Sequence, residues 1–107
     1  MKILSFSPGQ SPQIEDVEFD ADFLHQRLGF SFMMKGFGEN FIIYARTKIG
    51  DGFNCMLGNR AIYGKLFITR IVQSESSSKE GDLSEEDISA LTTLIEVSRN
   101  SAVSAEA

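Results

Sequence analysis

The stretch of sequence that decides the fold is FSFMMKGFGENFIIYAR, from Phe30 to Arg46. It holds two runs rich in apolar and aromatic residues, which are typical of β-strands. A connector with two glycines, Gly36–Asn40, separates the two runs and suits a β-hairpin. Both faces of the second run are apolar, because apolar residues occur at its odd and its even positions. We therefore predict paired strands over residues 30–35 and 41–46, in the centre of a sheet.

The residues before this hairpin predict a strand, a turn and a short helix. Residues 2–6 (KILSF) are β-prone and run into Pro8-Gly9. This dipeptide is typical of a type II turn, because proline presets φ and glycine accepts a positive φ. Asp20 is suited to cap a helix N-terminus and Gly29 to end that helix. We therefore predict a helix over residues 21–28.

The remaining segments predict three more strands, a loop and a second helix. The strands are expected around residues 17–19, 53–57 and 66–72. Residues 73–82 hold four serines and no apolar residue, which is typical of a mobile surface loop. Ser84 is suited to cap a helix whose first turn is acidic, and apolar residues recur at helical spacing from Ile88 to Ile95. We predict a helix over residues 84–97 and a flexible tail over residues 98–107.

Composition bounds the architecture and the class of protein. The chain has 107 residues, of which 42% are apolar, enough for one small core, and we predict a single domain over residues 1–97. The expected fold class is α+β, with a mostly antiparallel sheet of four to five strands and two helices packed on one face. The net charge of −5 argues against a surface that coats DNA or adsorbs to membranes. No segment approaches the roughly 20 apolar residues of a membrane span, so we expect no membrane partner.

The inventory of reactive residues is small. Cys55 is the only cysteine, which excludes an intramolecular disulfide and favours a reducing compartment. The apolar run Met1–Leu4 is too short for a signal peptide, so we expect a cytoplasmic protein. Cys55 and the single histidine, His25, are too few for a zinc site, and they form the one nucleophile-and-base pair available. A buried thiol and a helix-edge histidine are the commoner roles, so we predict no catalytic residue, metal or cofactor.

Charges are unevenly distributed along the chain. Residues 23–72 hold seven bases and two acids, residues 1–22 hold one base and five acids, and residues 73–107 hold two bases and eight acids. The basic middle can contact phosphates or an acidic protein, and the acidic flanks can occupy a basic groove on a partner. The same charges also suit solvated strand edges and helix starts, which are common in soluble domains.

The candidate contact residues are bases of this middle segment and aromatic residues close to turns. The bases expected to gather on one face or loop rim are Lys35, Arg46, Lys48, Arg60, Lys65 and Arg70. The aromatic candidates are Phe37, Phe53 and Tyr63. The candidates for an acidic surface are Glu80, Asp82, Glu85 and Glu86.

Three phrases are distinctive in combination: KIL followed by Pro8-Gly9 and Pro12, NRAIYGKLFI at residues 59–68, and GDLSEEDI at residues 81–88. Their order resembles an uncharacterised family, a domain of unknown function found in small proteins of bacteria, phages and plasmids. The resemblance spans about residues 2–95. It implies a compact α+β domain from a bacterial or mobile-element setting, and it assigns no catalytic residues.

We weigh three functions. The leading hypothesis is a non-catalytic interaction module, phage- or mobile-element-borne, that binds or inhibits a host macromolecule, with a host protein as the expected partner and counter-defence as one role. The second is a small enzyme or ligand-binding domain that uses Cys55 with His25, or the Asn59-Arg60 loop. The third is nucleic-acid binding through the basic middle segment. The aromatic residues near turns also leave a homodimer open.

Overall fold

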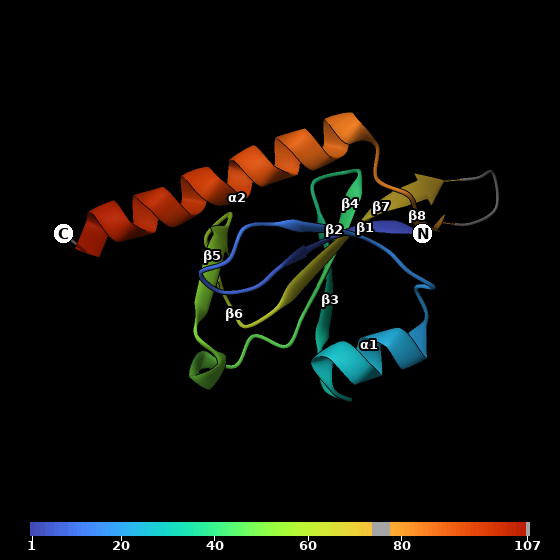
Figure 1. Ribbon diagram of the computed structural model, residues 1–107, viewed down its shortest axis with the longest axis horizontal. Coiled ribbons are helices and arrows are strands. Elements are labelled where there is room, and N and C mark those ends of the chain that lie inside the picture. Colours follow the sequence, from blue (N-terminus) through green and yellow to red (C-terminus); the bar gives the residue numbers. More distant parts are fainter. Residues whose placement is uncertain (74–77, 107) are drawn as a thin grey trace.

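A computed structural model of the chain describes residues 1–73 and 78–106, and the side chains of residues 1–72 and 80–100. Figure 1 shows a sheet between two helices. In chain order the elements are β1 (Lys2–Phe6), β2 (Gln13–Asp16), α1 (Ala21–Leu28), β3 (Met33–Phe37), β4 (Phe41–Ala45), the 3₁₀ turn η1 (Ile49–Asp51), β5 (Phe53–Leu57), β6 (Arg60–Tyr63), β7 (Leu66–Gln73), β8 (Ser78–Gly81) and α2 (Glu85–Glu106).

The main sheet is antiparallel and is built around β7. Its strand order is β2-β1-β7-β4-β3, and β8 pairs with the second half of β7. On the side of β7 that faces away from β4, residues 66–68 pair with β1 and residues 70–73 with β8. Strands β5 and β6 form a separate two-stranded sheet. The predicted α+β class with a mostly antiparallel sheet is confirmed, and over the described residues the main sheet has six strands rather than four to five.

The two helices lie on opposite faces of the sheet, so the expectation that both cover one face is wrong (Figure 1). Ile3 of β1 packs in a cluster with residues of α1, whereas its neighbour Leu4 packs in a cluster with residues of α2. Successive strand residues point to opposite faces, so the two clusters lie on the two sides of the sheet. Because β1, β4 and β7 are apolar on both faces, each face needs a cover to exclude water.

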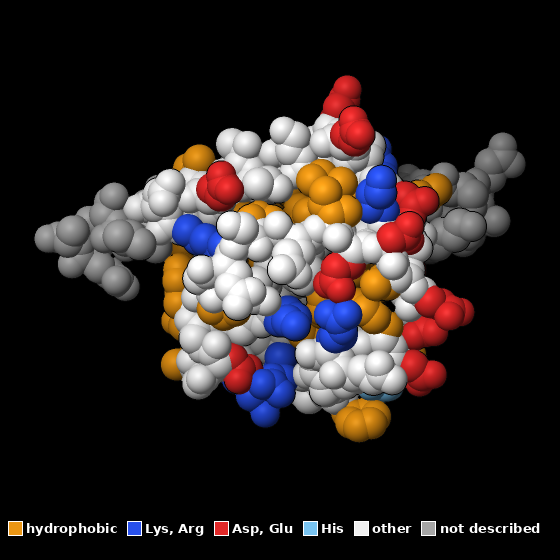
Figure 2. Space-filling view, in the orientation of Figure 1, with side chains coloured by type: hydrophobic (Ala, Val, Ile, Leu, Met, Phe, Trp, Pro, Cys, Tyr) orange, Lys and Arg blue, Asp and Glu red, His pale blue; other side chains and the backbone are white. Residues whose placement is uncertain are grey.

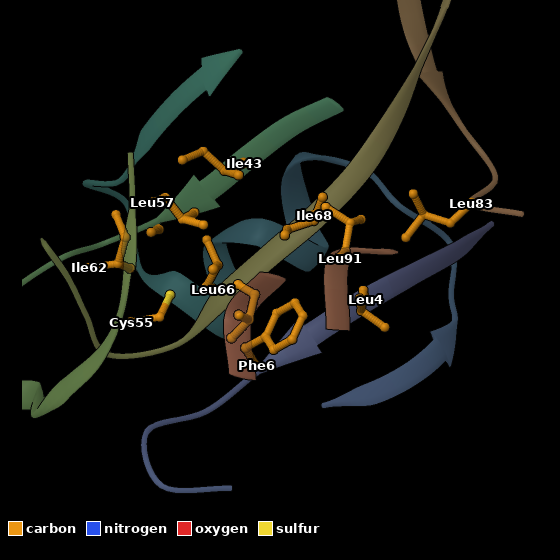
Figure 3. Close-up of a cluster of buried hydrophobic side chains, with 12 residues drawn as sticks. Leu4, Phe6, Ile43, Cys55, Leu57, Ile62, Leu66, Ile68, Leu83 and Leu91 are labelled. Carbon is orange, nitrogen blue, oxygen red and sulfur yellow. The ribbon is translucent and has the colours of Figure 1, made fainter. Parts of the chain in front are cut away.

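The larger cluster lies under α2 and the β5–β6 hairpin (Figure 3). Leu91 and Ile95 of α2 pack there against side chains from β1, β4 and β7. Cys55 and Ile62 of the β5–β6 hairpin belong to the same cluster. The smaller cluster joins Leu24 and Leu28 of α1 to residues such as Ile3, Tyr44 and Phe67. Each fully buried aliphatic side chain stabilises the fold by about 1.5–3 kcal/mol relative to its exposed state.

Capping and turn residues in the sequence correctly predicted the positions of helix α1 and of the turn after β1. Helix α1 spans the predicted residues 21–28, and the Asp20 side chain accepts a hydrogen bond from the Phe23 amide at 2.8 Å. Gly29 ends the helix with φ of 83°. The turn after β1 closes with a 3.1 Å hydrogen bond from the Gln10 amide to the Ser7 carbonyl.

Other predicted bounds are wrong. Strand β3 begins at Met33 rather than Phe30, because its pairing with β4 starts at Met33, while Phe30 lies against the His25 ring with centroids 4.6 Å apart; β3 lies at the sheet edge rather than in its centre. The strand expected around residues 17–19 lies at Gln13–Asp16, in register with β1, while Val17 and Phe19 pack toward α1.

Two predictions near the C-terminus also need correction. Part of the expected loop over residues 73–82 is strand β8, which pairs through its backbone and so needs no apolar signal. Residues 74–77 of that predicted loop, including Glu75, lie outside the described residues. Helix α2 continues to Glu106, past the predicted end at residue 97, because Ser98 and Arg99 of the expected tail dock on the body of the protein.

Candidate functional site

Cys55 and His25, the one nucleophile-and-base pair that the sequence offers, lie on different sides of the sheet. Cys55 is fully buried in the cluster under α2, and its sulfur points among apolar side chains (Figure 3). Burial raises the pKa of the Cys55 thiol to about 11, although the nearby Arg99 charge opposes that rise. His25 belongs to α1, on the opposite face, and stacks on Phe30. The structure therefore does not bring the two groups into a reactive pair.

Arg99 was missed at the sequence level, where it lay in the expected tail. Its guanidinium donates to the backbone carbonyls of Ser7, Gln10 and Asn54 and to the Asn54 side-chain oxygen, at 2.6–2.9 Å. The Asn54 amide in turn donates to the Phe6 and Gly64 carbonyls. These contacts fasten α2 to the first turn and to β5, so Arg99 has a structural role.

Two of the predicted bases, Arg46 and Lys65, meet in a pocket of about 420 Å³ between the end of α1 and the loop that carries η1. We call this the basic pocket and define it by its charged or titratable residues. They are His25, Arg27, Arg46, Asp51 and Lys65. Besides His25, three bases line the pocket with one acid, so the pocket favours a negatively charged group.

Ion pairs hold two of these bases in place. Arg46 donates from Nε and Nη2 to Oδ2 of Asp51, at 3.0 and 2.7 Å, and Arg27 donates to Glu15 at 3.0 Å. Thr47, directly after Arg46, has φ of 51°, a conformation that is unfavourable for a β-branched residue. Thr47 lies in the segment between Arg46 and Asp51, which are in contact. None of the ion pairs among the described residues involves Lys65.

Two further bases line a smaller pocket of about 200 Å³ beside the edge strand β3. We call this the edge pocket. Lys35 and Phe37 come from β3, Asn59 comes from the β5–β6 turn, and Arg60 is the first residue of β6. The Arg60 guanidinium lies 3.1 Å from the Met33 sulfur, and no acid lines this pocket.

The other contact candidates are dispersed. Lys48 is exposed on the loop before η1, and Arg70 is held by Asp87 at 2.7 Å on the α2 side of the molecule. Phe53 and Tyr63 pack edge-to-face across the β5–β6 hairpin, with ring centroids 5.9 Å apart. Four of the six predicted bases therefore line two separate pockets, and Lys48 and Arg70 line neither, so the six do not form one continuous basic face.

The acidic candidates lie toward one end of the molecule, near the N-terminus. Asp82 accepts a 2.7 Å hydrogen bond from the Lys2 amide, and Glu80 accepts one from the buried Tyr44 hydroxyl at 2.5 Å. Burial and the Glu80 carboxylate raise the pKa of Tyr44. Glu85 and Glu86 are exposed in the first turn of α2. In Figure 2, Asp and Glu side chains lie mainly along the right of the face shown, whereas several Lys and Arg side chains gather near its middle and lower edge.

Searches for metal and membrane features give negative results over the described residues. There, no group of three or more His, Cys, Asp or Glu side chains could hold a metal ion. None of the helices in the described part is long and apolar enough to cross a membrane.

Comparisons with protein-family models, with curated proteins and with solved structures found no match to this chain. The resemblance to an uncharacterised phage and plasmid family therefore stays a prediction. Function has to be argued from the geometry alone.

Proposed function

We propose that this protein is a non-catalytic interaction module that binds an acidic surface of a partner protein through the basic pocket. The observation that carries this proposal is the convergence of Arg27, Arg46 and Lys65 around a pocket with one acid, Asp51. Their charges come from three separated parts of the chain, which the fold brings to one place. A host macromolecule as partner, in a phage or mobile-element setting, is part of the same proposal.

The residues of the basic pocket are better suited to bind a carboxylate than to catalyse a reaction on it. Arg46 is already satisfied by two hydrogen bonds to Asp51, and Arg27 by one to Glu15. Lys65 therefore supplies the positive charge that is available to a partner. Its flexible side chain is suited to contact a single charged group. His25 lines the same pocket and can donate one further hydrogen bond. An exposed charge pair of this kind contributes modestly to affinity but strongly to orientation and association rate.

The separation of Cys55 from His25 supports a non-catalytic role over the small-enzyme hypothesis. A thiol nucleophile needs a low pKa and a base within hydrogen-bond reach. Cys55 has the opposite properties, since it is fully buried and its pKa is raised. Nucleic-acid binding through the basic middle is less well supported, because Arg70 is paired with Asp87 and Arg60 belongs to the other pocket.

The test is an NMR titration of the isotope-labelled protein with a short polyglutamate peptide and, separately, with a short DNA duplex. The peptide is expected to shift the backbone amides of pocket residues such as Gly29, Arg46 and Lys65. The variant Lys65→Glu should abolish those shifts, whereas Lys48→Glu, the same charge change outside the pocket, should leave them. The proposal would be contradicted if the protein bound DNA more tightly than the peptide. It would also be contradicted if Lys65→Glu and Lys48→Glu lost the peptide-induced shifts to the same extent.

A further inference from the structure

The edge of the sheet at β3 has the features of a strand-addition site. β3 pairs with β4 on one side, and β4 is its only described partner strand. A free strand edge presents N–H and C=O groups that another extended chain can pair with. Proteins often protect such an edge with proline, a bulge or several charges. β3 (MMKGF) has one charge, Lys35, no proline and an unbroken register with β4.

The edge pocket supplies a positively charged recess beside this strand. Lys35 and Arg60 line it, together with the aromatic ring of Phe37, and no acid lines it. The polar contact of Arg60 is to the Met33 sulfur, which is a weak acceptor and leaves the guanidinium charge unneutralised. Arginine is suited to bind a carboxylate through two parallel hydrogen bonds. The recess therefore suits an Asp or Glu side chain.

The other face of the same strand offers an apolar contact. Met34 is 63% exposed, although methionine is usually buried. Met34 and Lys35 are consecutive strand residues and so point to opposite faces. A chain added alongside β3 would place its side chains alternately next to the edge pocket and next to Met34. The complementary sequence is one in which acidic and apolar residues alternate.

We propose that β3 accepts an extended acidic segment of a partner protein as an added strand, with a carboxylate seated between Lys35 and Arg60. This site is separate from the basic pocket, and it rests on the proposed function only in that both sites select an acidic partner. The edge strand β2 is not equivalent. Its charged residues are the acids Glu15 and Asp16, and the cations beside them, Arg27 and the N-terminal amine, are already paired with them, so this edge offers an acidic segment no free positive charge.

A second copy of this chain is a poorer occupant of the β3 edge. Two β3 strands paired antiparallel about their centre would place Lys35 opposite Lys35, and like charges directly opposite each other destabilise a strand pair. Addition of β2 from another copy would be a head-to-tail contact, which gives a ring or a fibre, and both acids of β2 are already paired, with Arg27 and with the N-terminal amine. Charge complementarity therefore favours a separate acidic segment.

The inference is tested by fluorescence anisotropy with a labelled synthetic peptide in which glutamate alternates with valine. The protein is expected to bind this peptide and not a matched peptide in which lysine replaces glutamate. N-methylation of alternate peptide nitrogens on the pairing side should abolish binding, because it removes the hydrogen bonds of an added strand. Equal binding of the methylated peptide would overturn strand addition, since charge attraction alone does not need those nitrogens.

Charge-reversal variants test whether the peptide binds at the edge pocket. Lys35→Glu and Arg60→Glu are exposed changes and should each weaken peptide binding by about tenfold or more, the loss expected for a charge-assisted hydrogen bond. Lys48→Glu, the same charge reversal at an exposed residue that lines neither pocket, serves as the matched control and should change the affinity by less than about twofold. Equal weakening by all three variants would overturn the edge site.

Hydrogen exchange gives a readout that does not depend on any variant. The peptide should slow amide exchange within residues 33–37 of β3 and leave β2 unchanged. Protection at β2 instead, or peptide-free self-association that protects β3, would contradict the inference. Absence of peptide binding would also overturn it, while capture of a partner that depends on Lys65 would leave the basic-pocket proposal standing.

Discussion

Arg99 of α2 and Asn54 of β5 are joined by two hydrogen bonds, from Nε to the Asn54 carbonyl at 2.9 Å and from Nη2 to its side-chain oxygen at 2.7 Å. Asn54 is almost fully buried, and its amide nitrogen donates to the Phe6 and Gly64 carbonyls. The pair therefore connects the C-terminal helix to both the main sheet and the small hairpin. Without it, α2 would lose two of the hydrogen bonds that fasten it at the hairpin end, where the Met56 amide also donates to the Ser98 hydroxyl.

Replacing Arg99 by methionine should lower the free energy of unfolding by about 2–4 kcal/mol, because two oxygens of the buried Asn54 and two further carbonyls lose a charged donor. Arg99→Lys should recover only part of that loss, since lysine cannot reproduce the planar fork. Chemical denaturation followed by circular dichroism measures both values. Lys48→Met, at an exposed site, is the control and should change stability by about 0.5 kcal/mol or less. A similar small effect for Arg99→Met would show that the hydrogen bonds of Arg99 are dispensable.

The buried Cys55 thiol predicts a loss of stability in alkaline solution. Its pKa is about 11 in the folded state against 9.0 for an unperturbed thiol, so folding favours the protonated form. This contribution is complete below pH 9 and disappears as the pH rises toward 11. Across that window, the stability difference between the wild type and Cys55→Ala should shrink by about 2–3 kcal/mol. A difference that stays constant with pH would contradict the assigned pKa.

The same burial predicts slow alkylation of Cys55. At neutral pH the thiolate fraction should be about 100-fold below that of a free thiol, as the two-unit rise in pKa requires. Iodoacetamide should therefore react at the rate at which the protein opens, and denaturant should accelerate the reaction. Fast labelling of the native protein, followed by mass spectrometry, would revive the small-enzyme hypothesis.

Asp87 predicts a second pH dependence, in acid. Although burial opposes it, hydrogen bonds from the Ser84 amide, from Arg70 and from the Ser84 side chain lower the pKa of Asp87. A lowered pKa contributes stability that is present at neutral pH and lost as the pH falls through the folded-state pKa. Asp87→Asn should therefore destabilise the protein by about 1–2 kcal/mol at pH 7, with a smaller effect in acid.

The control for this prediction is Glu86→Gln, which neutralises an exposed acid next to Asp87 in the same helical turn. It should change stability by about 0.5 kcal/mol or less at either pH. Thermal unfolding of both variants at pH 7 and in acid measures the two effects on stability. Equal effects of the two substitutions would mean that the Arg70–Asp87 contact contributes nothing specific.

Elements with local signals could be predicted from the sequence. Helix α1 was located to the residue, because its cap at Asp20 and its stop at Gly29 are neighbours of the helix in the chain. Strand β8 could not be found in this way. It pairs with residues 70–73 through its backbone, and its own residues carry no apolar alternation.

Features that depend on distant residues were the ones that sequence reasoning missed. The acceptors of Arg99 lie 45 to 92 residues away in the chain. The residues next to Arg99 in the sequence therefore do not indicate that it fastens α2 to the rest of the protein. The placement of the helices on opposite faces follows from strands that are apolar on both sides, a pattern that was visible in FIIYA but was assigned to a central hairpin. Likewise, Arg46 and Lys65 were both candidates, but their meeting in one pocket with Arg27 depends on the fold.

The most direct test of the proposed function is affinity capture from a lysate of the cells in which the protein naturally occurs. The immobilised wild type is compared with Lys65→Glu and Lys48→Glu by quantitative mass spectrometry at low and at high salt. We predict a protein partner that wild type and Lys48→Glu retain at low salt, that Lys65→Glu loses, and that high salt releases. Equal retention by all three forms, or no retained protein at low salt, would contradict the account.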